Sequence, residues 1–484
     1  MTAAEIPMPD DLPPDDDDTP NRIALVDPDG GAMSIEEHRG QLRFAERVVT
    51  EHSNTMRHVH GIGWHIWDGA RWAPDKNGAP ARKVIDTMKA ALYEAIGLDK
   101  ADRDALMKDV RRNESASGVD GTLSLAGRML PISISHDVLD ANPALFNLPS
   151  ATLDLTSTQR LPHNRADHIS RVAAADPGDT GAEIWAAFLA RVLPDDDVRS
   201  FVQRLIGYSM LGQVREHVMP IFTGTGANGK GTFRDAVLHA FGDYAHEVGP
   251  ELLMESKHPR HGTFKMQLRG RRLVFCSETQ QGARFDAETM KRLVGGDPIE
   301  ANLMRRDPIT FLPSHTLIML TNHLPVISGE DEAVWRRVLV VPFHVVIPED
   351  ERDPGLSQEL KAAAPAVMAW AAAGWREYQR IGLAAPDAVR ASTDAYREDS
   401  DQLGRFLAER CIPGPRMHVG ARDLYHAYTA WCSAVGERTA GEKDFAKSMA
   451  AKGMEKRKTG SGLRYWGVGL EDDTPEGDTP GRDR

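Results

Sequence analysis

The sequence predicts an α/β protein built around a phosphate-binding loop, and three observations indicate this fold class. An apolar stretch from Val218 to Phe222 runs into a glycine-rich turn, and Lys230 then opens a segment with helical apolar spacing. Two later apolar runs each end in a polar residue, Glu278 and Asn322. Strands that carry such residues at their carboxyl ends are typical of a parallel sheet whose ligand lies at that edge.

The turn has the spacing of a phosphate loop, because four residues separate Gly224 from Gly229 and Lys230. Glycines let backbone N–H groups turn toward an anion, a helix start adds partial positive charge, and the lysine pairs with the β- and γ-phosphates. A plain glycine-rich turn with a surface lysine is the alternative. The residues expected to bind ATP are Gly224, Thr225, Gly226, Ala227, Asn228, Gly229, Lys230, Gly231 and Thr232.

ATP hydrolysis also needs groups around the γ-phosphate, and the later apolar runs offer candidates. Glu278 can help hold Mg²⁺ and polarise the attacking water, and Asn322 can orient the same water. Arg336 and Arg337 precede a third apolar run and can reach a neighbouring subunit's γ-phosphate. A surface salt bridge is the alternative for these arginines.

The metal site departs from the common pattern. Gly231 follows the loop lysine at a position where many phosphate loops place a Mg²⁺-binding hydroxyl, and Thr232 comes one residue late. Direct ligation of Mg²⁺ by Thr232 is therefore uncertain, and Glu278 becomes the first metal-site residue to test.

Charge and cysteine content exclude several classes of protein. The net charge is −13, of which residues 1–20 contribute −7 and residues 471–484 contribute −4. The rest of the chain is therefore nearly neutral. Both tails are acidic and Pro/Gly/Asp-rich, and we expect them to be disordered. The three cysteines form no C-x-x-C pair, which excludes a cysteine zinc ribbon. No apolar run reaches the roughly 18 residues of a membrane span, so we expect an intracellular, cytoplasmic protein.

Flanking segments complete the predicted organisation. A helix is expected over 34–52 with Ser34 at its start, an aromatic hairpin over 63–72, and two amphipathic helices over 181–212 that break at Pro194. The predicted segments are an acidic tail (1–20), a mainly helical N-terminal domain (21–178), the ATPase (179–350) with a helical collar (179–213), a helical connector (351–394), a winged-helix-like domain (395–470) and a second acidic tail (471–484).

Six ordered motifs resemble the superfamily III helicase module, most closely that of the phage and plasmid primase-helicase family, which is related to the poxvirus primase-helicase. The resemblance is dense across about 180–345. The motifs are Phe222 to Phe233, Arg272 to Thr279, Met290 to Ile299, Phe311 to Pro313, Leu320 to Pro325 and Val334 to Phe343.

The resemblance implies an AAA+ ring, expected to be a hexamer, that hydrolyses ATP between subunits and moves 3′ to 5′ on single-stranded DNA. Lys230 matches the phosphate-binding lysine, Glu278 the catalytic carboxylate and Asn322 the sensor. Arg336 or Arg337 matches the arginine finger.

Two basic segments are candidates for contact with single-stranded and forked DNA. Residues 291–306 match the part of the module that includes a hairpin projecting into the central channel, and residues 443–464 carry seven Lys/Arg against two acids. A solvated turn and a solubilising face are the respective alternatives. The candidate residues are Lys291, Arg305, Arg306, Lys456, Arg457, Lys458 and Arg464.

Other functions are weighed against the helicase. Primer synthesis is not expected in this chain, since residues 60–170 offer no paired-Asp motif, although a separate primase or other replication proteins are expected partners. A small-molecule kinase would not need the basic C-terminal segment. A packaging motor would need a cluster of acidic nuclease residues after its ATPase. An initiator or loader that uses ATP only to assemble on DNA remains open, as does the helicase half of a primase-helicase system.

Overall fold

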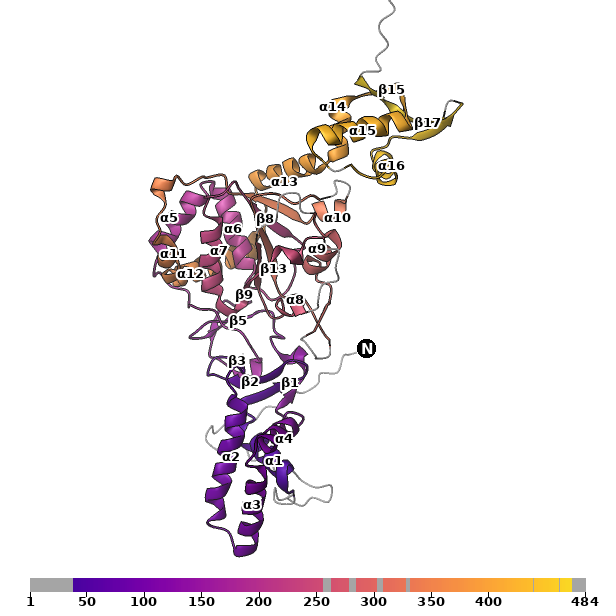
Figure 1. Cartoon of the computed structure of the whole chain (residues 1–484). Coiled ribbons are helices and arrows are strands. Elements are labelled where there is room, and N and C mark those ends of the chain that lie inside the picture. The colour runs from indigo at the N-terminus through magenta and orange to yellow at the C-terminus, as the bar shows by residue number, and fades with distance from the viewer. Residues whose placement is uncertain are drawn as a thin grey trace, which may run out of the picture. The chain divides into compact units, whose positions relative to one another are not determined.

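Figure 1 shows a computed structural model of the chain, which describes residues 38–255, 263–277, 284–302, 308–327, 331–437, 439–460 and 462–471. The chain divides into two compact units. Unit 1 runs to Asp68 and resumes over Trp72–Val138, and unit 2 comprises Gly69–Arg71 and the chain from Leu139 onward. The acidic tail predicted at 1–20 lies outside the described residues, as does the tail at 471–484 beyond Glu471.

Unit 1 packs four helices beside a small sheet with strand order β3-β2-β1-β4. Its elements are α1 (Gly40–His52), β1 (Met56–Val59), β2 (Gly63–Trp67), β3 (Trp72–Pro74), α2 (Ala79–Ala95), α3 (Lys100–Asn113), α4 (Ala116–Ala126) and β4 (Ser133–Ile134). The predicted aromatic hairpin is confirmed, since Trp67 pairs with Trp72. The predicted start of the first helix is wrong, because Arg39 is extended and α1 begins at Gly40; Ser34 lies outside the described residues.

Unit 2 contains the predicted parallel sheet, with strand order β14-β8-β13-β10-β9. Every neighbouring pair in it is parallel. Its strands are β8 (Met219–Thr223), β9 (Ala245–Val248), β10 (Leu273–Ser277), β13 (Thr316–Thr321) and β14 (Val338–Pro342). The strand that leads to Asn322 therefore lies between the phosphate-loop strand and the strand that precedes Glu278.

Helices cover both faces of this sheet, which explains why its strands are apolar throughout. Alternate strand residues, such as Phe222 and Ile318, face one group of helices. The residues between them, such as Ile221 and Met319, face a second group. The first group is α5 (Ala182–Val192), α6 (Asp196–Tyr208), α7 (Lys230–Phe241), α11 (Leu356–Ala362) and α12 (Ala364–Ile381), and the second includes α9 (Ala287–Val294) and α10 (Glu332–Trp335).

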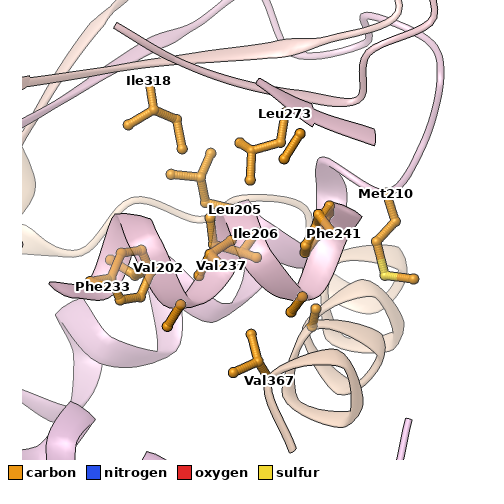
Figure 2. Packing of buried hydrophobic residues seen from close by; sticks show 14 of the residues in the cluster. Val202, Leu205, Ile206, Met210, Phe233, Val237, Phe241, Leu273, Ile318 and Val367 are labelled. Atoms are coloured by element: carbon orange, nitrogen blue, oxygen red, sulfur yellow. The ribbon is translucent and has the colours of Figure 1, made fainter. Parts of the chain in front are cut away.

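Figure 2 shows how the first face is closed: side chains from α6 and α7 converge with Leu273 and Ile318 of the sheet and with Val367 of α12. The helix pair predicted before the loop is confirmed as α5 and α6. The Asp195 side chain caps α6 by accepting hydrogen bonds from the backbone N–H groups of Asp197 (2.9 Å) and Val198 (3.1 Å).

A small sheet made of β5 (Leu145–Asn147), β6 (Thr152–Asp154) and β7 (Arg160–Leu161) also belongs to unit 2. Trp375 of α12 donates its indole N–H to the Leu155 carbonyl at 2.7 Å, and the Asn147 backbone N–H donates to the Tyr244 hydroxyl at 2.9 Å. The chain thus divides after Val138, whereas the sequence prediction ended the N-terminal domain at residue 178.

The C-terminal part of unit 2 has its own core, built around Phe406, Tyr428 and Trp431. Its elements are α14 (Gln402–Arg410), β15 (Cys411–Gly420), α15 (Ala421–Val435), α16 (Glu442–Ala451), β16 (Lys456–Thr459) and β17 (Gly462–Leu470). This part thus contains three helices and the β16–β17 hairpin. The strand β15 was not predicted; it pairs with β17 on both sides of an irregularity between Pro413 and His418.

The remaining elements of unit 2 are short or connect these parts. They are α8 (Thr263–Met266), β11 (Ile299–Ala301), β12 (Ile309–Phe311) and α13 (Asp387–Ser400), with single 3₁₀ turns at Arg165–Asp167, Gly242–Tyr244, Pro250–Leu252 and Glu349–Glu351. Among the described helices, none combines the length and the apolar character that a membrane crossing requires.

Candidate active site

The glycine-rich loop joins the end of β8 to the start of α7. Gly226 (φ 104°) and Gly229 (φ 79°) take left-handed backbone conformations that favour glycine, and Ala227 (φ 49°) joins them. Within the described part of the chain, the backbone N–H groups from Thr225 to Gly229 donate no hydrogen bond. Successive backbone N–H groups left unpaired at the start of a helix form a cradle suited to an anion.

Lys230 lies almost fully buried beneath this cradle, with 5% of its surface exposed. Its Nζ donates to the Gly224 carbonyl at 2.9 Å, to Asn228 Oδ1 at 3.2 Å and to Asn322 Oδ1 at 3.0 Å. The structure therefore brings together the predicted phosphate-binding lysine and the predicted sensor.

Strand register explains how Asn322 reaches the loop. Thr321, the last residue of β13, pairs with Thr223, the last residue of β8, so the residue after each strand emerges at the same edge. The Thr321 hydroxyl donates to the His323 carbonyl at 2.6 Å and accepts from its N–H at 3.1 Å, which fixes the turn that holds Asn322.

The end of β14 braces the other side of the loop. Asn228 Nδ2 donates to the Phe343 carbonyl at 3.3 Å, and the Ile347 N–H donates to the Ala227 carbonyl at 2.8 Å. Asn228 thus contacts Lys230 with its side-chain oxygen and β14 with its side-chain nitrogen. The sequence predicted Asn228 only as a phosphate-loop residue, and no local signal indicates this bracing role.

Packing also fixes the loop glycines. A Cβ atom on Gly229 would lie 2.4 Å from Val192 Cγ1 of α5, and one on Gly224 would lie 2.3 Å from the Phe343 carbonyl oxygen. Gly231 has no atom within 4 Å of the corresponding position. The loop is therefore closely packed against the helix before it and the strand after it, while its last glycine faces open space.

The predicted acid, Glu278, lies outside the described residues, directly after Ser277 at the end of β10. Around Ser277 the structure reveals a network that the sequence did not indicate. Arg234 of α7 donates from Nη1 to Glu247 Oε1 at 2.8 Å and to the Ser277 hydroxyl at 3.1 Å, and Ser277 also contacts Glu247. This network ties the helix that follows the phosphate loop to the strand that precedes Glu278.

Cys276, next to this network, is fully buried, and burial with nearby Glu251 and Glu247 raises the pKa of its thiol to about 12. A reactive thiolate is therefore not part of this site. In the portion of the chain that the structure describes, no three His, Cys, Asp or Glu side chains gather where they could hold a metal ion.

The two arginines predicted as candidate fingers have different environments. The Arg337 side chain is half-buried and donates from Nη1 to the Ala333 carbonyl of its own helical turn at 2.6 Å. Arg336 is exposed, and its side chain makes no hydrogen bond or ion pair with any described residue. Of the two, Arg336 is the more exposed.

The predicted DNA hairpin is described at its base only. β11 and β12 pair antiparallel, with Ile299 opposite Phe311, while Arg305 and Arg306 lie outside the described residues. Lys291, on the preceding helix α9, forms an ion pair with Asp331 at 2.6 Å.

The C-terminal basic residues lie on the β16–β17 hairpin. Lys456, Arg457 and Lys458 are exposed on β16. Lys456 Nζ lies 5.4 Å from the Tyr465 ring centre, and the Arg457 guanidinium lies 5.7 Å from that of Trp466. Arg457 also pairs with Glu455, and Arg464 Nη1 lies 3.0 Å from His418 Nδ1. The hairpin presents cations backed by aromatic rings.

Comparisons with known proteins match two parts of the chain to families. Residues 45–194 match the family described as D5 N terminal like, and residues 222–337 match a family described as of unknown function, DUF5906. "Putative helicase L207/L206" of Acanthamoeba polyphaga mimivirus is 26% identical over 266 residues, covering 50% of this chain and 28% of the relative. These matches support the resemblance to the primase-helicase family.

Other relatives also carry helicase or primase names. "Putative helicase 022R" of Frog virus 3 is 28% identical, covering 59% of this chain and 31% of the relative. "Putative primase C962R" of African swine fever virus is 23% identical, covering 61% and 34%. The chain spans about a third of the length of these curated relatives. A structure titled "The A form apo structure of NrS-1 C terminal region-CTR" is 14% identical over 61% of this chain and 78% of its own, but its TM-score of 0.37 is too low for a structural argument.

Two glycine substitutions test the packing of the loop. Gly229→Ala should lower the free energy of unfolding by about 1–3 kcal/mol, because its methyl group meets Val192 and its backbone is left-handed. Gly231→Ala is the matched control and should be neutral or slightly stabilising, since it faces open space at a helix start. Equal losses in chemical denaturation would contradict the packing described here.

Proposed function

We propose that the chain is the ATP-dependent DNA helicase of a phage or plasmid replication system, a ring that moves 3′ to 5′ on single-stranded DNA. The observation that carries the proposal is the buried Lys230 ammonium, which contacts both the loop and Asn322 beneath a cradle of N–H donors that have no partner in the described part of the chain. Helicase and primase names among the relatives support the assignment to DNA replication.

ATP fits the cradle because the β- and γ-phosphates need backbone donors and a cation at the start of a helix. Mg²⁺ is usually held by one or two carboxylates together with substrate phosphates, so the site needs no cluster of protein ligands. Thr232 and Glu278 are the residues that would hold the ion. When bound, Mg²⁺ neutralises charge on the phosphates.

Hydrolysis requires a water molecule in line with the γ-phosphate. Asn322 already has its amide beside Lys230 Nζ, where it can orient that water, and Glu278 is proposed to polarise it. Arg336 is proposed as the arginine finger in preference to Arg337, because a finger has to leave its own subunit and Arg337 is engaged with its own helical turn.

DNA contact is proposed for two places in unit 2. The hairpin of β11 and β12 would present Arg305 and Arg306 to phosphates in the channel, and the basic β16–β17 hairpin would hold forked or duplex DNA. The three helices and hairpin of the C-terminal part support a winged-helix assignment. Cations paired with aromatic rings suit binding that does not depend on sequence.

A hexameric assembly with ATP sites between subunits is proposed from the resemblance to the superfamily III module. It is supported by the exposed Arg336, whose side chain has no partner among the described residues. The protein would work in the cytoplasm of a bacterial host, with a separate primase or other replication proteins as partners. An initiator that uses ATP only to assemble on DNA is the alternative, and it differs from a helicase in lacking strand displacement.

Lys230→Ala should lower the ATPase kcat by about 100-fold or more, because the phosphates lose a preorganised cation. Lys89→Ala removes a side chain that is 64% exposed in unit 1 and serves as the control with unchanged activity. Steady-state ATPase assays measure both. Hydrolysis at the normal rate by the Lys230 variant would exclude this loop as the ATP site.

Arg336→Ala should lower kcat by about 1,000-fold with little change in unfolding temperature, as expected for a finger. Arg337→Ala should instead affect stability more than kcat, since it loses a contact within its own helical turn. Mixing Arg336→Ala subunits with Glu278→Gln subunits should restore part of the ATPase activity. The proposal fails if no mixing ratio restores activity, or if Arg337→Ala has the larger effect on kcat.

A further inference from the structure

One ion pair joins the helix before the DNA hairpin to the turn that carries the proposed finger. Lys291 Nζ, in the last turn of α9, lies 2.6 Å from Asp331 Oδ2, and the two side chains are 31% and 28% exposed. This distance is that of a strong, charge-assisted hydrogen bond, and partial burial limits its screening by salt.

Asp331 determines how α10 begins. Its other oxygen, Oδ1, accepts from the Val334 backbone N–H at 3.3 Å, which makes it the N-cap of a helix of a single turn. The turn ends where the Arg336 N–H donates to the Glu332 carbonyl at 3.1 Å. A helix this short has little stability of its own, so the position of Arg336 depends on what holds the N-cap.

The opposite side of α10 is held by α13. Glu332 forms an ion pair with Arg397, and the Trp335 ring packs edge-on against Tyr396 with ring centres 5.1 Å apart. The turn α10 is therefore held between α9 and α13, and the ion pair of Lys291 connects it to α9.

Helix α9, which carries Lys291, also packs against the base of the β11–β12 hairpin. Met290 and Leu293 of α9 are buried in the same cluster as Ile299 at the start of β11, and Val334 and Trp335 of α10 belong to that cluster too. A displacement of the hairpin base would therefore move α9, and Lys291 with it.

We infer that Lys291 is a positioning residue: its ion pair with Asp331 couples the β11–β12 hairpin to Arg336. The inference rests on the proposed function, since it takes Arg336 as the finger. The sequence prediction of Lys291 as a DNA contact competes with it. The ammonium of Lys291 already has a carboxylate partner, whereas the neighbouring Arg292 is exposed and has no side-chain partner among the described residues.

Two isosteric variants separate these roles. Lys291→Met keeps the aliphatic stem, and Asp331→Asn removes the charge while an Asn side chain can still cap α10. Each should lower the ATPase kcat by about 10- to 100-fold, with KM for ATP and Kd for single-stranded DNA changed less than about threefold. The kcat of the double variant should be no lower than that of the more impaired single variant, because both substitutions remove the same interaction. Glu288→Gln, at an exposed position of the same helix, is the control and should leave kcat unchanged.

Subunit mixing measures whether ATPase activity is restored, which would not happen if Lys291 only stabilised the fold of its own subunit. Lys291→Met subunits keep an intact phosphate loop and Lys230→Ala subunits keep a well-placed Arg336, so mixing them should restore part of the ATPase activity. Unfolding temperatures confirm that each variant is folded. The inference is overturned if Lys291→Met weakens DNA binding while Asp331→Asn does not, if the two effects on kcat add, or if mixing restores nothing. A wild-type protein without ATPase activity would instead refute the proposed function.

Discussion

The site depends on the burial of one ammonium group. Removing a charge from water is costly unless hydrogen bonds replace the lost hydration, and Lys230 is 5% exposed. Three oxygens of described residues contribute to this compensation, from Gly224, Asn228 and Asn322. All three are neutral, whereas a phosphate bound in the cradle would bring a negative charge to the lysine. In the proposed reaction, these contacts would hold the lysine in place for the phosphates, which is how electrostatic stabilisation becomes effective in catalysis.

The rest of unit 2 holds these oxygens in place. Parallel pairing of β8 with β13 delivers Asn322, the end of β14 holds Asn228, and α5 packs on Gly229 through Val192. Each of these contacts joins segments that are distant in sequence. Arg234 joins α7, the helix after the loop, to the end of β10, the strand before Glu278. The Lys291–Asp331 pair joins α9, which packs on the hairpin base, to the turn that carries Arg336.

The features that could be predicted from the sequence are those that local residue patterns determine. The loop spacing, the apolar strands, the collar helices and the approach of Asn322 to Lys230 follow from periodicity and from the rule that parallel strands end at one edge. β9 was missed because its sequence, Ala-His-Glu-Val, is short and has no clear apolar run, and β15 because it contains Pro413 and Pro415. The bracing by Asn228 and the partner of Lys291 could not be predicted, since each depends on a residue brought near only by folding. The different exposure of Arg336 and Arg337 could not be predicted either, because it depends on how their turn packs.

The most direct test of the central claim is strand displacement on duplexes that carry a single-stranded tail at either the 3′ or the 5′ end. With ATP and Mg²⁺, the protein should unwind the 3′-tailed duplex and leave the 5′-tailed duplex intact. Unwinding of the 5′-tailed duplex alone would contradict the direction, and ATP hydrolysis without displacement of either duplex would contradict the helicase and favour an initiator.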